Sequence, residues 1–302
     1  MITKSRKKKS SYLFDGFRIA SYLIGAAGTL LAVQTMYVIL ATPRLAPPKN
    51  SGYDFDEEGL LVEYVSGDAD VLKNEFQLVL IGDSPVEGIG HDCHFKTLGG
   101  RTALAFSQHL KRSVRFWSFG KSGLTAEGIE KEMVPFLEGM HSKKKRMDAI
   151  IVSVGVNNVL IGQSAIKFYQ EVKILLQSIE QYSGHAKIIV MDLLDFAHMP
   201  FLPYPLRQVL SWKSKSLQMG LEKATLELNL NFKNIHMSYL PNVHELFEGN
   251  REHWFWDYLR LSKDERQRIQ PSDFFAADKF HPGGYGCDII SKVLVDTFLD
   301  PT

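Results

Sequence analysis

The chain has too few cysteines for a disulfide framework and no excess of either charge. Cys93 and Cys287 are its only cysteines, so one bridge at most is possible, and two free thiols are the simpler expectation. Lys and Arg number 35, Asp and Glu 34, and the formal net charge is +1. The basic clusters at residues 4–9 and 143–146 contain no aromatic side chains. A nucleic-acid partner is therefore not expected.

The sequence also offers little to a metal ion or a cofactor. Its one cluster of ligand-type side chains, at residues 91–94, reads His-Asp-Cys-His. That spacing matches no common zinc site, and no second pair completes it, so we expect a loop there and no metal. Internal repeats and low-complexity tracts are missing as well. We therefore expect a chain that works without a cofactor.

A long uncharged stretch near the N-terminus is the first positive feature. Residues 19–41 contain no charged side chain over about 23 positions. A bilayer core takes about 20 helical residues, whereas the apolar part of a cleaved signal is about 7–15 residues long. The stretch therefore predicts one transmembrane signal anchor. A buried core helix, and cleavage after export, are the alternatives.

The basic residues around this stretch predict its orientation. Six Lys and Arg residues precede it within residues 1–18, and only Arg44 and Lys49 follow closely. By the positive-inside bias, residues 1–18 form a cytoplasmic tail and the large domain is exported. In a bacterium that domain would lie on the periplasmic side of the inner membrane. Residues 42–74 are rich in proline, glycine and acids, which predicts a linker, although its apolar residues 60–62 could pack on the domain.

Strand and helix patterns alternate through the remaining residues, 75–302. Apolar runs predict strands at 76–81, 114–117, 149–154, 187–191 and 232–237. Helical patterns fall at 97–111, 125–139, from 164 onward, 207–228 and 284–298, with Thr125 and Ser164 as helix caps. Such alternation predicts the α/β class, with right-handed crossovers and a parallel sheet covered on both faces. Ligands bind such sheets at the carboxyl ends of the strands.

Four short polar segments fall where that rule places a site. Gly-Asp-Ser at 82–84, Phe-Gly-Lys-Ser-Gly-Leu-Thr at 119–125 and Val-Gly-Val-Asn-Asn at 154–158 each follow a predicted strand. The fourth, Asp-Lys-Phe-His-Pro at 278–282, precedes the last helix. A serine hydroxyl becomes a good nucleophile when a base takes its proton, and a carboxylate can orient a histidine for that task. Ser84, His281 and Asp278 are therefore candidates for nucleophile, base and orienting acid.

Together and in this order, the four segments resemble the SGNH (GDSL-type) hydrolase family over about residues 75–300. The resemblance implies a three-layer α/β/α sandwich with a flavodoxin-like parallel sheet. It also implies a serine esterase or lipase-type hydrolase that uses Ser84, Asp278 and His281 as a catalytic triad. The family's oxyanion hole carries over to the backbone amides of Ser84 and Gly123 and the side chain of Asn157. No G-x-S-x-G surrounds Ser84, which disfavours the α/β-hydrolase fold.

The chain departs from the family pattern at two positions. Pro85 replaces the usual leucine after the serine, and a helix tolerates proline in its first turn. Asn158 stands where an aspartate often follows the oxyanion asparagine, which leaves the local hydrogen bonding open. Gly120 is an alternative to Gly123 as the second oxyanion donor.

Several readings of function stay open at this stage. The leading one is hydrolysis of a lysophospholipid, another lipid or an acetyl ester outside the cytoplasm, with the substrate and the membrane as the only expected partners. An acyltransferase or deacetylase acting on envelope glycans, and an exported binding module without catalysis, are the alternatives. In a purely structural interpretation, Ser84 only caps a helix, Asn157 ends a strand and His281 lies in a surface turn. The aromatic, proline-broken segment 196–205 could line an acyl pocket, touch the membrane or pack as an ordinary loop.

Overall fold

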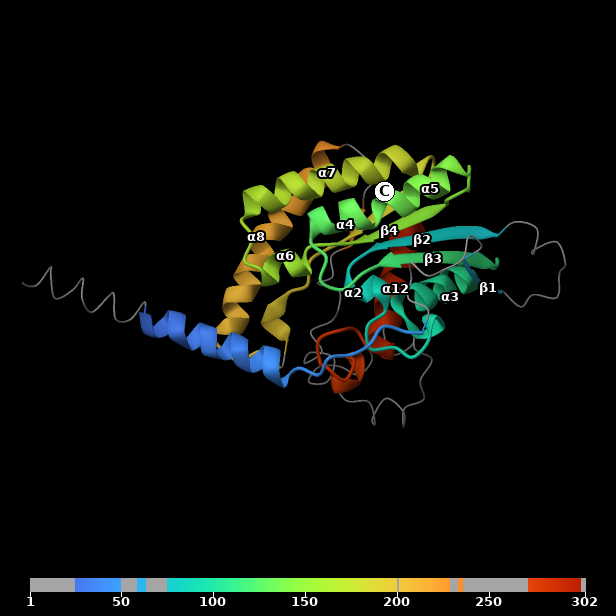
Figure 1. The fold of residues 1–302 in the computed structure, drawn as a ribbon. Helices are drawn as coiled ribbons and strands as arrows, with labels where there is room; N and C mark the ends of the chain where they lie inside the picture. Colours follow the sequence, from blue (N-terminus) through green and yellow to red (C-terminus); the bar gives the residue numbers. More distant parts are fainter. Residues whose placement is uncertain are drawn as a thin grey trace, which may run out of the picture.

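The computed structural model describes residues 25–49, 59–63, 75–199, 201–228, 233–235 and 271–299. The predicted tail 1–18, the first part of the predicted anchor and most of the predicted strand 232–237 lie outside these ranges. Residues 25–41 are helical and project from the domain (Figure 1). Within the described ranges, no helix combines the length and apolarity needed to cross a membrane.

Six strands form one mostly parallel sheet in the order β1-β3-β2-β4-β5-β6. Its parallel members are β2 (Phe76–Gly82), β3 (Val114–Gly120), β4 (Ala149–Ser153), β5 (Lys187–Met191) and β6 (Lys233–Ile235). These strands are runs of apolar residues because helices cover both faces, and every residue of β4 is buried. The five follow the strand order of flavodoxin. The predicted α/β class is confirmed.

The edge strand β1 (Leu60–Val62) departs from the predicted all-parallel sheet. It pairs antiparallel with β3, with Leu61 opposite Arg115, and Val62 is buried in the core. This strand lies inside the segment predicted as a linker, residues 42–74. Its apolar side chains complete the sheet edge, so part of that segment belongs to the folded domain.

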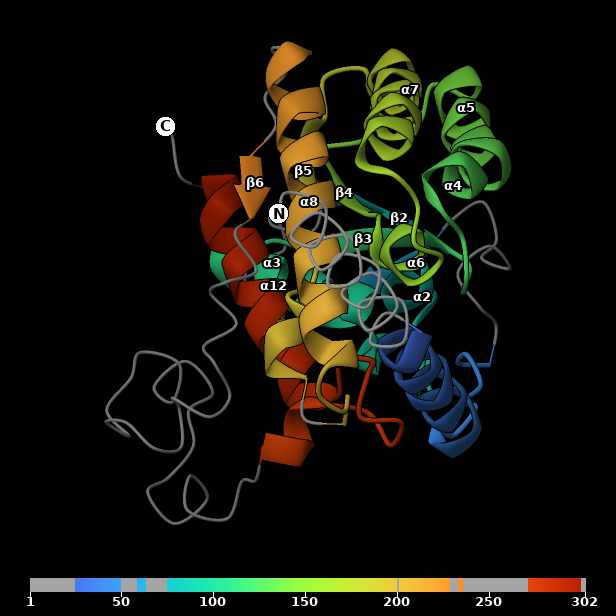
Figure 2. The ribbon, with the colours of Figure 1, turned by 90° about the vertical axis from the view of Figure 1, so that its left-hand side faces the viewer.

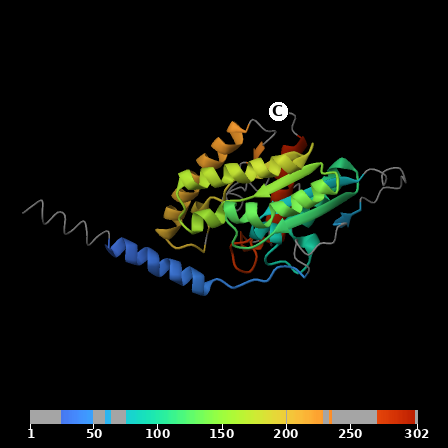
Figure 3. The same ribbon diagram turned by 45° about the horizontal axis from the view of Figure 1, so that its top comes forward.

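Helices form a layer on each face of the sheet (Figures 1 and 3). One layer holds α3 (Leu98–Leu110) and α12 (Gly284–Leu299), and its apolar core includes Leu80, Phe106 and Leu294. The other holds α4 (Ala126–Glu132), α5 (Val134–Ser142), α7 (Ala165–Ser183) and α8 (Leu206–Glu227), around a second core that includes Phe168 and Leu217. Short helical elements precede several of the long helices in the chain: α2 (Ser84–Glu87), η3 (His94–Lys96), α6 (Val156–Leu160), η4 (Phe196–His198) and η6 (Pro271–Phe274).

Side-chain caps begin three of the helices. The hydroxyls of Thr125 and Ser164 accept hydrogen bonds from the third residue of α4 and of α7, as the sequence predicts. Thr97 caps α3 in the same way. The single helix predicted over 125–139 is instead two, divided at Met133, and Pro135 lies in the first turn of the second helix, where proline is tolerated.

Two glycines provide a test of the close contact between α2 and β3. A Cβ on Gly120 would overlap the backbone of Val86 and Glu87, whereas a Cβ on Gly139, within α5, would meet open space. We expect Gly120→Ala to lower the free energy of unfolding by about 1–3 kcal/mol. Gly139→Ala should raise it by about 0.5–1 kcal/mol, because alanine favours the helix. Urea unfolding of both variants checks this, and equal effects would contradict the packing described.

Candidate active site

The candidate site lies at the carboxyl ends of β2 and β4. Strand β2 lies between β3 and β4, and the chain passes from β2 to β3 on one side of it before it returns to form β4 on the other. Open parallel sheets bind ligands at such a switch point in strand order. Gly82 pairs with Gly120 and with Ser153, so the ends of three strands lie side by side. A Cβ on Gly82 would overlap the Ser153 carbonyl, so only glycine allows this approach.

Ser84 begins α2 immediately beyond this junction. Its side chain is only 6% exposed. In the described part of the chain, the backbone amides of Ser84 and Gly123 have no hydrogen-bond acceptor. Gly123 adopts a φ of 84°, which favours glycine, and a Cβ there would meet nothing within 4 Å. Both N–H groups are therefore free to donate to a bound group.

His281 and Asp278 form a tight pair in the turn before α12. The Nδ1 atom of His281 lies 2.5 Å from Oδ2 of Asp278. The other carboxylate oxygen accepts hydrogen bonds from the amides of Phe280 and His281, each 3.0 Å long. Burial raises the pKa of Asp278, but these hydrogen bonds outweigh it and hold the pKa below its usual value. An ionised Asp278 places the ring proton on Nδ1, which leaves Nε2 as a base.

His281 also lies near two carboxyl groups, those of Asp83, one residue before Ser84, and Glu87, three residues after it. Burial raises the pKa of Asp83 to about 6 and moves that of Glu87 upward, and in both cases the nearby His281 ring opposes the rise. A direct contact joins the two segments as well, because Nε2 of His91, seven residues after Ser84, lies 3.1 Å from the carbonyl of Pro282. That the Ser84 hydroxyl and the His281 ring meet stays a prediction of the sequence.

The buried carboxyl of Asp83 joins the third segment to the first. It accepts hydrogen bonds from the Ser153 hydroxyl (2.8 Å) and the Asn157 side-chain amide (3.3 Å). The same Asn157 nitrogen donates to the Leu124 carbonyl at 2.9 Å. Both hydrogens of this amide are thus engaged by the protein, and the bond to Asp83 is the longer of the two.

Asn158, where the sequence left the bonding open, is fully buried and well bonded. Its side-chain oxygen accepts from the Ala126 amide at 3.1 Å, and its nitrogen donates to Gln163. Asn158 therefore fixes α6 against the start of α4, which follows the segment that holds Gly123.

Sequence reasoning missed Glu87. Its carboxylate, 6% exposed, accepts a 2.6 Å hydrogen bond from the Ser122 amide and so holds the loop that contains Gly123. An acid three residues after Ser84 shares a helical face with it, and that spacing was the available signal.

The 91–94 segment also contributes to the site from outside. The Nε2 atom of His91 lies 3.1 Å from the Pro282 carbonyl and 3.6 Å from the Cys287 sulfur. Burial lowers the pKa of His91, which favours a neutral ring that donates to Pro282 and steadies the turn next to His281. Cys93 and Cys287 are free thiols. The described residues contain no group of three or more His, Cys, Asp or Glu side chains placed to hold a metal ion.

Comparisons with known proteins identify the family of the chain. The sequence profile of the GDSL-like Lipase/Acylhydrolase family matches residues 80–289. No curated protein sequence matches the chain. The lipase Lip_vut3 from a goat rumen metagenome has a similar structure, with a TM-score of 0.51, 16% identity, and coverage of 74% of this chain and 97% of that one.

Two further solved structures are similar at lower scores. They are a lipase/acylhydrolase from Enterococcus faecalis (TM-score 0.48, 16% identity, 73% of this chain and 94% of that one) and the psychrotrophic esterase EstA from Pseudoalteromonas sp. (0.47, 13%, 73% and 95%). At such identities, similar coordinates show the fold alone.

The raised pKa of Asp83 predicts an unusual dependence of stability on pH. The folded chain keeps the Asp83 proton up to about pH 6, whereas the unfolded chain loses it near pH 4. This residue's contribution to stability therefore falls as the pH rises through that window, by about 3 kcal/mol in total. We expect Asp83→Asn to gain about that much relative to wild type between about pH 3.5 and pH 7. Urea unfolding at both pH values measures this, and a constant difference would contradict it.

Proposed function

The chain belongs to the GDSL-like lipase/acylhydrolase family, and we propose that it cleaves acyl esters with Ser84 as nucleophile, His281 as base and Asp278 as orienting acid. Membership makes the protein a hydrolase that acts on ester bonds. The observation that supports the residue assignment is the 2.5 Å contact between His281 and Asp278, in a turn whose Pro282 carbonyl lies 3.1 Å from Nε2 of His91, seven residues after Ser84.

The proposed reaction passes through an acyl-enzyme. The Ser84 hydroxyl oxygen bonds to the ester carbonyl carbon while His281 Nε2 takes the hydroxyl proton. The resulting oxyanion is stabilised by the amides of Ser84 and Gly123, with Asn157 as the third donor. Each such donor typically lowers the barrier by about 3–4 kcal/mol. The bond to the leaving oxygen then breaks, and the alcohol departs with the proton from His281.

Water completes the cycle. His281 takes a proton from a water molecule, whose oxygen bonds to the acyl carbon, and the bond to Ser84 breaks as the proton returns to the serine oxygen. Asp278 stays ionised and holds the ring in one tautomer throughout. Carboxylic acid and alcohol are the products, and no cofactor enters any step.

Aromatic rings beside His281 favour an apolar acyl group in the proposed substrate. The Phe280 ring packs edge-on against the His281 ring at 5.1 Å between centroids, and Phe201 packs edge-on against Phe280 at 5.9 Å. We propose a lysophospholipid or another lipid ester as the substrate class. The proposal includes anchoring by residues 19–41, with residues 1–18 in the cytoplasm and the catalytic domain exported.

Covalent labelling tests the nucleophile. A fluorophosphonate probe should label the wild-type chain, and Ser84→Ala should remove the label because it removes the proposed nucleophile. Ser142→Ala, at the end of α5, is the matched control and should label normally. A folded wild-type chain that never labels would favour a binding module instead.

Substrate choice needs a panel of p-nitrophenyl esters with acyl chains from acetyl to palmitoyl. A lipid substrate predicts activity that increases with chain length, because each buried methylene contributes about 0.8 kcal/mol. Strict preference for acetyl would favour a deacetylase acting on envelope glycans. Transfer of the acyl group to an added sugar in preference to water would identify an acyltransferase.

Asp278→Asn tests the orienting acid. Asparagine can turn an N–H toward His281 and favour the wrong tautomer, so we expect kcat to fall by about 10³–10⁴-fold with little change in KM. Circular dichroism confirms the fold of the variant. An unchanged kcat would rule out the assigned role of Asp278.

A further inference from the structure

The outer side of α8 carries an exposed apolar stripe. Trp212, Met219 and Leu226 are 73%, 68% and 78% exposed, and their spacing of seven residues places them on one side of the helix. The opposite side of α8 is also apolar, since Leu217 and Leu221 are fully buried in the core. A helix that only covers a sheet needs one apolar side, so the second side calls for a contact beyond this domain.

Two lysines lie within the same stripe. Lys215 and Lys223 keep 68% and 63% of their side chains exposed although each contacts an acid, at 3.9 Å and 3.8 Å. An exposed helical face that mixes large apolar side chains with lysine is typical of helices lying in a membrane interface. Their long stems can rest on lipid while the ammonium groups reach the phosphates.

Helix 25–41 is hydrogen-bonded to the N-terminal end of α8 and to the residues just before it. Gln34 donates to the Tyr204 carbonyl at 2.7 Å and accepts from the Leu206 amide at 3.1 Å, and Leu31 and Val38 pack against the apolar core. The rest of this helix is an exposed apolar surface, formed by Leu30, Val33, Met36, Tyr37, Ile39 and Leu40. The helix is therefore docked on the domain.

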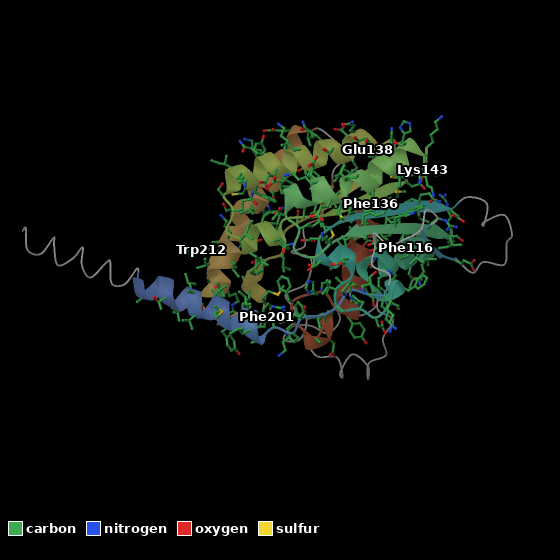
Figure 4. The ribbon with its side chains drawn as sticks, viewed as in Figure 1. Phe116, Phe136, Glu138, Lys143, Phe201 and Trp212 are labelled. Atoms are coloured by element: carbon green, nitrogen blue, oxygen red, sulfur yellow. The ribbon has the colours of Figure 1, made fainter. Side chains whose placement is uncertain are left out.

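The two helices face the same side of the molecule. Figure 2 shows α8 across the face from which helix 25–41 projects, and Figure 4 shows Trp212 at the outer edge of that face. Tyr204, 70% exposed, lies at the junction of the two helices. Tryptophan and tyrosine are enriched where proteins meet the head groups of a membrane.

We propose that this face, formed by Tyr204 and the exposed stripe of α8, is a lipid-binding surface that rests on the bilayer into which helix 25–41 extends. The inference rests on the proposed membrane anchoring and extends it, because the domain then lies on the membrane in one orientation. A second copy fits less well, because pairing two such stripes would bring Lys215 and Lys223 of each copy into the contact.

The orientation also defines the source of the substrate. The elements α2 and α6, which carry Ser84 and Asn157, lie on the side of the sheet that faces helix 25–41 (Figure 1). Phe201, in the segment between η4 and Tyr204, contacts Phe280 next to His281. The catalytic groups thus lie next to the proposed lipid surface, and the ester they cleave is one that resides in or at the bilayer.

Fluorescence quenching by lipid tests the surface directly. The full chain is reconstituted in vesicles of equal parts phosphatidylcholine and phosphatidylglycerol, with or without bromine on the acyl chains. The chain has four tryptophans, so wild type is compared with Trp212→Phe. We expect bromolipids to quench a component of the wild-type emission that Trp212→Phe lacks.

New tryptophans in the Trp212→Phe background map the extent of the contact. Met219→Trp and Leu226→Trp lie about 10 and 21 Å farther along α8, and both should be quenched if α8 lies along the membrane. Glu138→Trp is the matched control, because Glu138 is exposed on α5, far from α8 (Figure 4), and should not be quenched. Equal quenching of wild type and Trp212→Phe would overturn the proposal. So would concentration-dependent dimerisation, measured by light scattering, that Trp212→Glu abolishes.

Activity separates this proposal from that of the catalytic residues. Trp212→Glu should lower hydrolysis of p-nitrophenyl palmitate in the vesicles by about tenfold, since a charge replaces a large apolar contact. Hydrolysis of p-nitrophenyl acetate in water should not change. Ser84→Ala should abolish both reactions and leave the quenching of Trp212 intact. Equal loss of both reactions in a folded Trp212→Glu variant would contradict the proposed lipid-binding surface, and it would leave the assignment of the catalytic residues unaffected.

Discussion

The carboxyl group of Asp83 ties together the strand ends on which the whole site is built. It is completely buried where β2 meets β4, and it accepts hydrogen bonds from the Ser153 hydroxyl and the Asn157 side-chain amide. Burying a carboxyl is unfavourable unless hydrogen bonds or proton uptake compensate. Here both occur, since the bonds are present and the pKa is raised to about 6. The geometry around Ser84 depends on that compromise.

Around this centre, two neighbouring side chains hold the segments that carry candidate catalytic groups. Glu87 fixes the loop of Gly123 through the Ser122 amide, and His91 steadies the turn of His281 through the Pro282 carbonyl. Such supports matter because catalytic groups lose efficiency when they shift by even a fraction of their hydrogen-bond length. The site therefore draws on positions 83 to 91 and 278 to 287 as one unit.

Local patterns in the sequence were sufficient for most of the fold. Apolar runs located β2, β4 and β5, and the caps at Thr125 and Ser164 were confirmed, because these features depend on neighbours in the chain. The antiparallel β1 and the contact between Glu87 and Ser122 were not foreseen. Both depend on segments distant in sequence, and their patterns are short and ambiguous.

The site was predictable for a related reason. Residues that follow parallel strands gather at one edge of the sheet, so the approach of residues 82–84 and Asn157 follows from topology, whereas the turn at 278–282 precedes a helix and its place was implied by the family resemblance alone. The roles of these residues in catalysis stay predictions. The engagement of both Asn157 hydrogens was not foreseeable, because it depends on the rotamer that Asp83 and the Leu124 carbonyl impose together.

The paired hydrogen bonds of Gln34 have a mechanical consequence. The Gln34 side chain is hydrogen-bonded to the backbone at both Tyr204 and Leu206. A change in the tilt of helix 25–41 would therefore shift this segment, which includes Phe201, whose ring contacts Phe280. Helices adjust their tilt to the thickness of the surrounding bilayer. In a membrane-embedded chain, the thickness of the bilayer would then influence the position of the turn that contains His281.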